Sequence, residues 1–296
     1  MIENLGLVNG HIVGRVLKEA VRRATVAIRS ERAAFETHAK MSYGGTMDDV
    51  FTSADKKAQE IYLRTFRECF PACGVIAEED VLRIEAQPGC DAYFTVDPLD
   101  GTKAYIRRQS HGVGTMVALV ERGVVTSAYI GDINTEEVYG YRPGSERVHR
   151  ITRLDTFEEL GYGNPADLLA SYALLRDPLS EYSAPTQAVI TRGFKNYEVM
   201  GSSIGIWMAR LWKREVGALF LPPGWETPWD STPTIGISLK LGYSFLRPTG
   251  RGGEWVGYEP TIPREMYRRE HDTLVMHRND VPKLFPLFLQ HNGERP

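Results

Sequence analysis

Two aspartates three residues apart are the most informative feature of this sequence. Asp97 and Asp100 stand in the hexapeptide DPLDGT, directly after the apolar run AYFTV. A proline turn at this point could aim both carboxylates at one position. Hard divalent cations such as Mg²⁺ prefer carboxylate and carbonyl oxygens and complete their coordination with water and substrate phosphate. The hexapeptide therefore predicts a metal site, to which the Leu99 carbonyl could contribute. The structural alternative is an Asp-Pro turn closed by an Asx cap.

A second group of acidic residues follows a neighbouring apolar run. Glu78, Glu79 and Asp80 come directly after GVIA. If both runs are strands of one sheet, their acids gather at the same edge. Like charges there repel and raise one another's pKa, whereas a bound cation stabilises every ionised form. An acidic triplet alone is more often a solvated strand end, so the metal prediction depends on the two groups together.

Gly101 and Thr102 follow the second aspartate and are expected to open a helix or turn. Exposed backbone N–H groups and the helix dipole at such a position favour an anion such as phosphate. A metal site and a phosphate site would then be adjacent. The sequence has no GxxxxGK[ST] loop and no HExxH motif, so nucleotide-triphosphate and zinc-protease chemistry fit poorly.

The spacing of apolar residues predicts the helices that position these acids. From His11 to about Ser30, apolar residues recur every three or four positions, which is typical of one face of a helix. A second helical pattern, TSADKKAQEIYLRTFRECF, can be capped by Thr52 or Ser53 and is ended by the proline that follows it. Asp49 is then expected on the loop between the two helices.

Strands are expected in GVIAEED and DAYFTVDPLD, and an antiparallel meander from Val113 to Tyr141 that turns at Glu121 to Gly123. After residue 145 the pattern alternates between strands and helices, in the order TQAVITRG, SSIGIWMARLWKREVG, ALFLPP, the segment after WDSTP, and YSFLRP. We expect an N-terminal α+β subdomain, residues 1–145, with most of the metal ligands, and a C-terminal α/β subdomain, residues 146–296, that contributes Asp230 and the substrate pocket. A rigid interface with a ligand cleft would join them.

The composition is that of an ordinary globular protein. With 296 residues and a formal charge of -3, the chain gives no electrostatic reason to expect a nucleic-acid polymer or a membrane as partner. The sequence lacks both a signal-peptide apolar segment near its start and a stretch long enough to span a bilayer. Three cysteines without CxxC spacing favour packing roles in a reduced, cytoplasmic protein. A small soluble ligand is expected.

Four segments together, DVFTSAD, AEED, DPLDGT and PWDSTP, resemble the inositol monophosphatase family. The resemblance spans most of the chain. It implies a layered α/β sandwich in the order α-β-α-β-α, a Mg²⁺-dependent and lithium-sensitive phosphatase, and a homodimer. The family also includes nucleotide 3'(2')-phosphatases and histidinol-phosphatase-like enzymes.

The resemblance further implies a set of metal ligands. Glu78, Asp97 and the Leu99 carbonyl would hold a first Mg²⁺, and Asp97, Asp100 and Asp230 would hold a second, with Asp97 bridging the pair. Two or three ions are expected. Asp230 stands in WDSTP, which predicts the start of a helix with Pro233 in its first turn.

Catalytic roles follow from the same resemblance. Asp49 would pair with Thr102 to position and deprotonate the attacking water, and Glu78 could share the role of base. Loop and helix-start positions favour acids for structural reasons alone. That structural reading is preferred for Asp55, whereas the catalytic one is preferred for Asp49.

Substrate-binding roles are expected for two short segments. Gly101 and Thr102 would bind phosphate, and Gly201 with Ser202 would line the substrate pocket, although a helix N-cap explains the second segment equally well. Lys40 resembles a basic residue near the phosphate, but its spacing is irregular and an exposed lysine is the simpler expectation.

Two departures from the family pattern bear on the substrate. Inositol-specific members carry a carboxylate a few residues before their Trp-Asp pair, whereas LPPGWETPWD has proline there and Glu226 displaced. Lys103 gives DGTK, which resembles the nucleotidase-like and histidinol-phosphatase-like branches. The expected function is Mg²⁺-dependent hydrolysis of a small phosphate monoester, an inositol phosphate or a related sugar or polyol phosphate. The alternatives are a 3'(2'),5'-bisphosphate nucleotidase or histidinol-phosphatase-like enzyme and, in a different class, a non-catalytic interaction protein.

Overall fold

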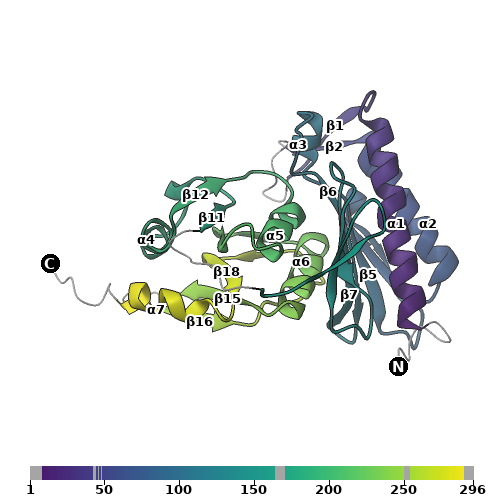
Figure 1. The fold of residues 1–296 in the computed structure, drawn as a ribbon. Helices are drawn as coiled ribbons and strands as arrows, with labels where there is room; N and C mark the ends of the chain where they lie inside the picture. Colours follow the sequence, from purple (N-terminus) through teal and green to yellow (C-terminus); the bar gives the residue numbers. More distant parts are fainter. Residues whose placement is uncertain are drawn as a thin grey trace.

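The computed structural model describes residues 9–42, 45, 47, 49–163, 171–249 and 254–289. Their helices and sheets form layers in the order helix, sheet, helix, sheet, helix (Figure 1), which confirms the predicted α/β sandwich. From the outer face of the larger sheet to the far side of the smaller one, the helical layers are α1 (Gly10–Glu31) with α2 (Ser53–Cys69), α5 (Ile204–Trp212) with α6 (Pro228–Lys240), and α4 (Ala184–Gly193) with α7 (Val281–Leu289).

The larger sheet carries most of the acidic residues. Its strand order is β10-β9-β8-β7-β6-β5-β3-β4, with β3 and β5 parallel and the other neighbours antiparallel. The strands are β3 (Gly74–Ala77), β4 (Leu82–Ile84), β5 (Ala92–Asp100), β6 (Gly114–Glu121), β7 (Val124–Asp132), β8 (Val138–Tyr141), β9 (Val148–Ile151) and β10 (Phe157–Leu160). The predicted meander is confirmed as β6-β7-β8. Its first hairpin turns at Arg122 and Gly123, whose φ angles of 50° and 76° are those of a tight primed turn.

The smaller sheet completes the second half of the chain. Its order is β12-β11-β13-β18-β15-β16, from β11 (Tyr172–Leu175), β12 (Asn196–Val199), β13 (Ala218–Leu221), β15 (Tyr243–Pro248), β16 (Trp255–Tyr258) and β18 (Thr273–His277). Two short ribbons pair β1 (Thr37–Lys40) with β2 (Asp49–Thr52) and β14 (Gly224–Glu226) with β17 (Tyr267–Arg269). Short helical turns occur at α3 (Thr102–Ile106), η2 (Glu79–Val81) and η4 (Leu179–Glu181).

The two N-terminal helices form for the predicted reasons. The apolar stripe of α1, including Leu17, Val21 and Ile28, is fully buried in the core beneath the larger sheet. Thr52 is the N-cap of α2, and the Asp55 carboxylate accepts a hydrogen bond from the Thr52 backbone N–H in a capping box. Asp49 is the first residue of β2, so its predicted loop position is wrong: it pairs with Lys40 across the β1-β2 ribbon.

The segment TQAVITRG is helical, which corrects its prediction as a strand. It lies in α4, where Pro185 occupies the first turn after Ser183 and pre-sets a helical φ. Thr186, Val189 and Ile190 are buried, at spacings of three and four. Tertiary burial of this face outweighs the strand propensity of the β-branched residues.

Three further expectations can be compared with the structure. Cys73 and Cys90 pack against the core as expected, whereas Cys69 is exposed and has no packing role. The larger sheet continues to Leu160, so a division between the sheets falls later than residue 145; two separate subdomains remain a prediction. In the described part of the chain, no helix has the length and apolar character needed to cross a membrane.

Candidate functional site

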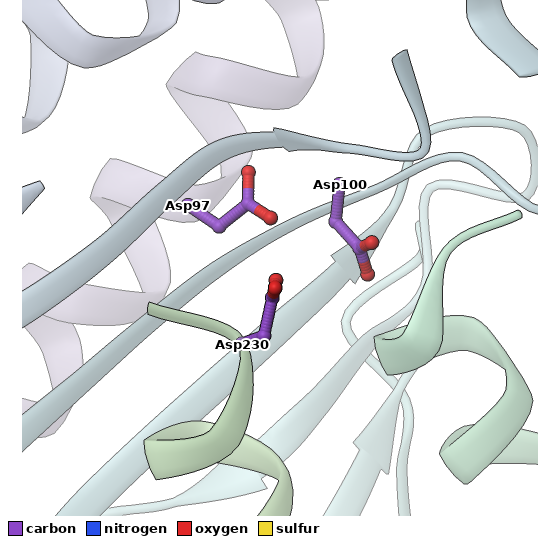
Figure 2. A group of neighbouring side chains, drawn as sticks. All are labelled: Asp97, Asp100 and Asp230. Carbon is purple, nitrogen blue, oxygen red and sulfur yellow. The ribbon is translucent and has the colours of Figure 1, made fainter. Parts of the chain in front are cut away.

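Three aspartates distant in sequence converge between the two sheets. One carboxylate oxygen from each of Asp97, Asp100 and Asp230 lies within 4.8 Å of the others. Figure 2 shows the three side chains directed toward a common point, the first two from β5 and the third from α6. Asp97 and Asp100 are buried, and Asp230 is partly buried.

A bulge in β5 allows its two aspartates to face the same way. Side chains alternate along a strand, so residues three apart normally point to opposite faces. Here the pairing register shifts between Asp97, opposite Met116, and Asp100, opposite Gly114, and an extra residue in the strand restores a common face. DPLD is therefore a bulged strand rather than the predicted turn. Gly101, at φ +91°, ends it.

The N-terminus of α5 fixes the Asp100 carboxylate. The backbone N–H groups of Ile204 and Gly205 donate to it at 3.1 and 2.8 Å, and the Ser203 hydroxyl donates as well. Ser203 is also the N-cap of α5, so the cap expected as an alternative in GSS is present one residue after Ser202. A helix N-terminus stabilises negative charge, which orients one predicted metal ligand before any metal binds.

Asp230 is positioned by a second helix start. Thr227 is the N-cap of α6, accepts from the backbone N–H of Asp230 at 3.2 Å and donates its hydroxyl proton to the carboxylate at 2.9 Å. The helix begins at Pro228, a favourable first position. The prediction that Asp230 lies at a helix start is thus confirmed, but Pro233 lies inside the helix rather than in its first turn.

Glu78 is held by a lysine that the sequence pattern had suggested was exposed. Lys40 Nζ lies 2.8 Å from Glu78 Oε1 and 3.1 Å from Glu79 Oε1, with only 20% of its side chain exposed. Burial lowers the pKa of Lys40, but the two carboxylates outweigh that effect and raise it overall. The expectation of an exposed lysine is wrong because the β1-β2 ribbon carries it over the acidic edge of the sheet.

The acid that contacts Thr102 is Asp55. Thr102 Oγ1 lies 3.1 Å from Asp55 Oδ1 and 3.1 Å from the Leu99 carbonyl, whereas Asp49 lies 3.8 Å from Lys103 Nζ. The predicted pairing of Asp49 with Thr102 is therefore wrong. The structural role predicted for Asp55 is confirmed by its capping box, and its second oxygen adds the contact with Thr102. The capping box of α2 points Asp55 inward, where burial, with a smaller contribution from the Glu78 charge, raises its pKa to about 6.

The predicted residues nevertheless share one cavity of about 330 Å³. It is lined by every residue predicted for the site, namely Asp49, Glu78, Asp97, Leu99, Asp100, Gly101, Thr102, Gly201, Ser202 and Asp230. Among the charged residues that line it, sequence reasoning missed Arg176 and Asp177. They follow the apolar strand β11, which is the same strand-then-polar pattern that revealed the acids.

The site's charges fit a hard divalent cation. Burial, followed by the charges of neighbouring carboxylates, raises the pKa of Asp97 well above its usual range, that of Asp100 to about 7 and that of Asp230 to about 6. These shifts mean that ionising the cluster is unfavourable without a compensating cation. The donors are carboxylate oxygens with a carbonyl nearby, and this set suits Mg²⁺. Glu78, Asp97, Leu99, Asp100 and Asp230 could hold it.

The fold and the site together define a class of protein: a five-layered α/β sandwich with a cluster of carboxylates between its sheets. Within that class, residues 12–149 match the model of the inositol monophosphatase family. This match, together with structural neighbours of the same fold, confirms the resemblance to that family.

Among curated proteins, the 3'(2'),5'-bisphosphate nucleotidase CysQ of Salmonella typhimurium is 39% identical over 85 residues, which are 28% of this chain and 34% of that protein. The Nus factor SuhB of Xylella fastidiosa is 30% identical over 100 residues, 34% of each chain. The matched segment thus spans about a third of these two relatives, 34% of each.

Solved structures share the whole fold. The extragenic suppressor protein suhB of Bartonella henselae has a TM-score of 0.71 at 16% identity, covering 93% of this chain and 98% of that one. An IMPase/NADP phosphatase complexed with Mg²⁺ and phosphate has a TM-score of 0.65 at 13% identity, covering 96% and 95%. At these identities the likeness establishes the fold.

Proposed function

We propose that this chain is a Mg²⁺-dependent phosphatase that hydrolyses a small phosphate monoester by direct attack of water. The main observation behind this proposal is that Asp97, Asp100 and Asp230 converge in one cavity, which Glu78 and Thr102 also line. The family match and the structural neighbour solved with Mg²⁺ and phosphate support it. Such a cluster of buried acids requires a cation, and Mg²⁺ in turn suits phosphate.

Two or three Mg²⁺ ions are proposed, with the carboxylates of Glu78, Asp97, Asp100 and Asp230 and the Leu99 carbonyl as protein ligands. When bound, the metal would supply Lewis-acid stabilisation of phosphate charge and a lower pKa for water.

The chain's own residues orient the reaction. The Thr102 hydroxyl, held between Asp55 and the Leu99 carbonyl, can hydrogen-bond the attacking water, and the Asp55 carboxylate can accept a proton through it. The Gly101 and Thr102 amides are proposed phosphate contacts. We assign to Asp55 the role first expected for Asp49, which instead lines the cavity beside Lys103.

The substrate is a phosphate monoester of a sugar, polyol or nucleoside. A nucleotidase alternative is supported by the similarity to CysQ. The contacts of Glu226 also support it. The Glu226 carboxylate accepts hydrogen bonds from Arg269 Nε at 2.7 Å and from the Ser231 hydroxyl at 2.5 Å. Because both of its oxygens are engaged, this carboxylate is poorly placed to bind inositol hydroxyls. A histidinol-phosphatase-like activity stays a prediction from DGTK. Lithium sensitivity, a homodimer and a cytoplasmic location remain proposals from the family resemblance.

A non-catalytic interaction protein is the alternative class, since the similar SuhB proteins are described as Nus factors. Because all of the proposed metal ligands line one cavity, we favour a catalytic function over this alternative.

Phosphate release tests this proposal directly. The protein should release phosphate from some member of a panel of inositol, sugar, histidinol and nucleoside phosphates, only with Mg²⁺. Asp97→Asn should abolish this, while Glu68→Gln, on the exposed surface of α2, should not. Calorimetric Mg²⁺ binding without phosphate release from any substrate would favour the non-catalytic alternative.

A further inference from the structure

A cavity of about 1030 Å³ lies between α1 and the strands β7 to β10 at one end of the larger sheet. Helix α1 covers the outer face of that sheet (Figure 1), whereas the aspartate cluster lies between the two sheets. In the described part of the chain, no residue lines both this cavity and the one that holds the aspartates. A ligand bound here would therefore occupy a second site, separate from the proposed active site.

A glycine in β8 opens the floor of this cavity. Tyr129 of β7, Gly140 of β8 and His149 of β9 are paired in one row across the sheet. Residues paired in this way direct their side chains to the same face. Tyr129 and His149 thus flank a position that has no side chain, and all three residues line the cavity.

The hydroxyl group of Tyr129 is a buried polar group with no partner among the residues that the structure describes. Tyr129 is only 5% exposed. Burial raises the pKa of its hydroxyl, and the nearby charge of Arg142 offsets part of that rise. The hydroxyl is therefore a neutral hydrogen-bond donor. Because buried polar groups are nearly always hydrogen-bonded, this one indicates an acceptor within the cavity.

Two arginines that line the cavity form no ion pair with any described carboxylate. The first, Arg142, packs over Gly14 of α1, where an added Cβ would lie 2.5 Å from Arg142 Cβ and 3.0 Å from the Tyr129 hydroxyl oxygen. Arg142 Nη1 donates to the Pro143 carbonyl at 3.1 Å, which leaves its other N–H groups available. The second, Arg15, follows Gly14 on α1 and is exposed.

The acidic residues that line the cavity already have cationic partners. Asp155 lies 2.7 Å from Arg22 and 3.4 Å from Lys18. Glu146 lies 3.2 Å from Lys240. The charge left unpaired in this cavity is therefore positive, which favours an anionic ligand.

An exposed aromatic ring lies at the other end of the cavity. Phe157 of β10 is 58% exposed, and the His149 ring meets its edge with 6.0 Å between the ring centroids. Lys18 Nζ lies 5.0 Å from the Phe157 ring centroid. Lys18 is one helical turn after Gly14, a rise of roughly 6 Å along α1. That spacing suits one ligand that carries both an anionic group and a flat ring.

We propose that this cavity is a second ligand site, which binds a small organic anion. Arg142 and the Tyr129 hydroxyl bind its phosphate or carboxylate group, Arg15 adds positive charge, and Phe157 packs against an attached ring. The inference goes beyond the proposed phosphatase function and does not rest on it.

Three probes separate the two kinds of contact. Phenylphosphonate carries an anion and a ring, methylphosphonate carries only the anion, and benzyl alcohol carries only the ring. Binding to the metal-free full chain is followed by NMR titration, because without metal the acidic aspartate cavity repels anions. Phenylphosphonate should bind about three- to tenfold more tightly than methylphosphonate, the gain expected from one aromatic contact. Benzyl alcohol should bind most weakly.

Three substitutions test the assigned contacts. Arg142→Gln should weaken the binding of both phosphonates by about 10- to 100-fold, the effect of losing charge-assisted hydrogen bonds. Tyr129→Phe keeps the packed ring and removes only the hydroxyl, so it should weaken both by about three- to tenfold. Phe157→Ala should reduce the affinity for phenylphosphonate to that for methylphosphonate and leave the latter unchanged.

Arg23→Gln is the matched control. Arg23 is also on α1, but it pairs with Glu19, has 66% of its side chain exposed and does not line the cavity. This change should leave both phosphonate affinities within about twofold of the wild type. Asp97→Asn, in the aspartate cluster, should leave them unchanged as well.

Three results would overturn the proposal. Equal losses in Arg142→Gln and Arg23→Gln would mean that the anions are attracted by overall charge. Loss of binding in Asp97→Asn would mean that they bind at the aspartates. The third is the absence of phosphonate binding at millimolar concentrations. None of these measurements needs phosphate release, so a failure of the phosphatase proposal would leave this test intact.

Discussion

Oγ1 of Thr102 lies 3.1 Å from Oδ1 of Asp55, whose other oxygen accepts hydrogen bonds from the backbone and hydroxyl of Thr52. One carboxylate thus caps α2 and contacts the DPLDGT segment. Thr102→Val should lower the kcat of phosphate release by about 10²- to 10³-fold, as expected for lost proton transfer or water positioning. Thr102→Ser should recover most of it.

Asp55 and Asp49 can be distinguished in the same assay. Asp55→Asn should reduce kcat as strongly as Thr102→Val, while Asp49→Asn, which alters a carboxylate paired with exposed Lys103, should change it by only a few fold. Thermal unfolding of both variants controls for loss of the cap. A larger kcat loss from the Asp49 substitution would restore its original assignment.

Lys40 compensates the buried carboxylate of Glu79 and the partly buried carboxylate of Glu78. Lys40→Met removes the ammonium group that contacts both. Since breaking a buried ion pair strands a charge, we expect the metal-free protein to lose about 3 kcal/mol of unfolding free energy in urea denaturation. Lys57→Met, whose partner is Glu31 and whose side chain is 53% exposed, should cost less than about 1 kcal/mol. Equal losses would contradict the proposed role of Lys40.

Gly205 gives Asp100 access to the α5 amides. A Cβ atom there would lie 2.7 Å from Met116 Sδ and 3.1 Å from Asp100 Oδ2. Gly205→Ala should therefore destabilise the protein by about 1–3 kcal/mol through overpacking. It should also weaken Mg²⁺ binding, because Asp100 must shift. Gly161→Ala, with no atom within 4 Å of its new Cβ, is the control and should change neither property.

The aspartate cluster predicts opposite pH trends without and with Mg²⁺. The raised pKa values of Asp100 and Asp230, about 7 and 6, mean that the folded metal-free protein binds more protons than the unfolded chain above pH 4, where free carboxylates ionise. Its unfolding free energy should then fall as the pH rises from about 4 to 7. Mg²⁺ should stabilise the protein more at pH 8 than at pH 5, because it binds the ionised form.

Urea titrations across this range, with and without Mg²⁺, test the trend. Asp97→Asn removes one of the repelling groups and should flatten the metal-free dependence while reducing the Mg²⁺ effect. A metal-free stability that rises with pH through this window would contradict the assigned charge pattern.

Much of the fold follows from local patterns. The apolar stripe of α1, the Thr52 cap of α2 and the β6-β7-β8 meander depend on residues close in sequence, so the sequence predicted them. The α4 helix was predicted wrongly because its β-branched residues favour a strand locally, while burial against the smaller sheet decides for a helix.

The chemistry of the site was also largely determined by the sequence. Acidic side chains at strand ends and a DPLDGT segment specify oxygen ligands, and hence a hard cation, whatever their exact placement. Tertiary structure decided which groups meet. The β5 bulge turns Asp97 and Asp100 to the same face of the sheet. The capping box of α2 places Asp55, and not Asp49, in contact with Thr102. The β1-β2 ribbon brings Lys40 into contact with Glu78. Residue type fixes what a group can bind, whereas register and burial, which depend on distant segments, fix what it contacts.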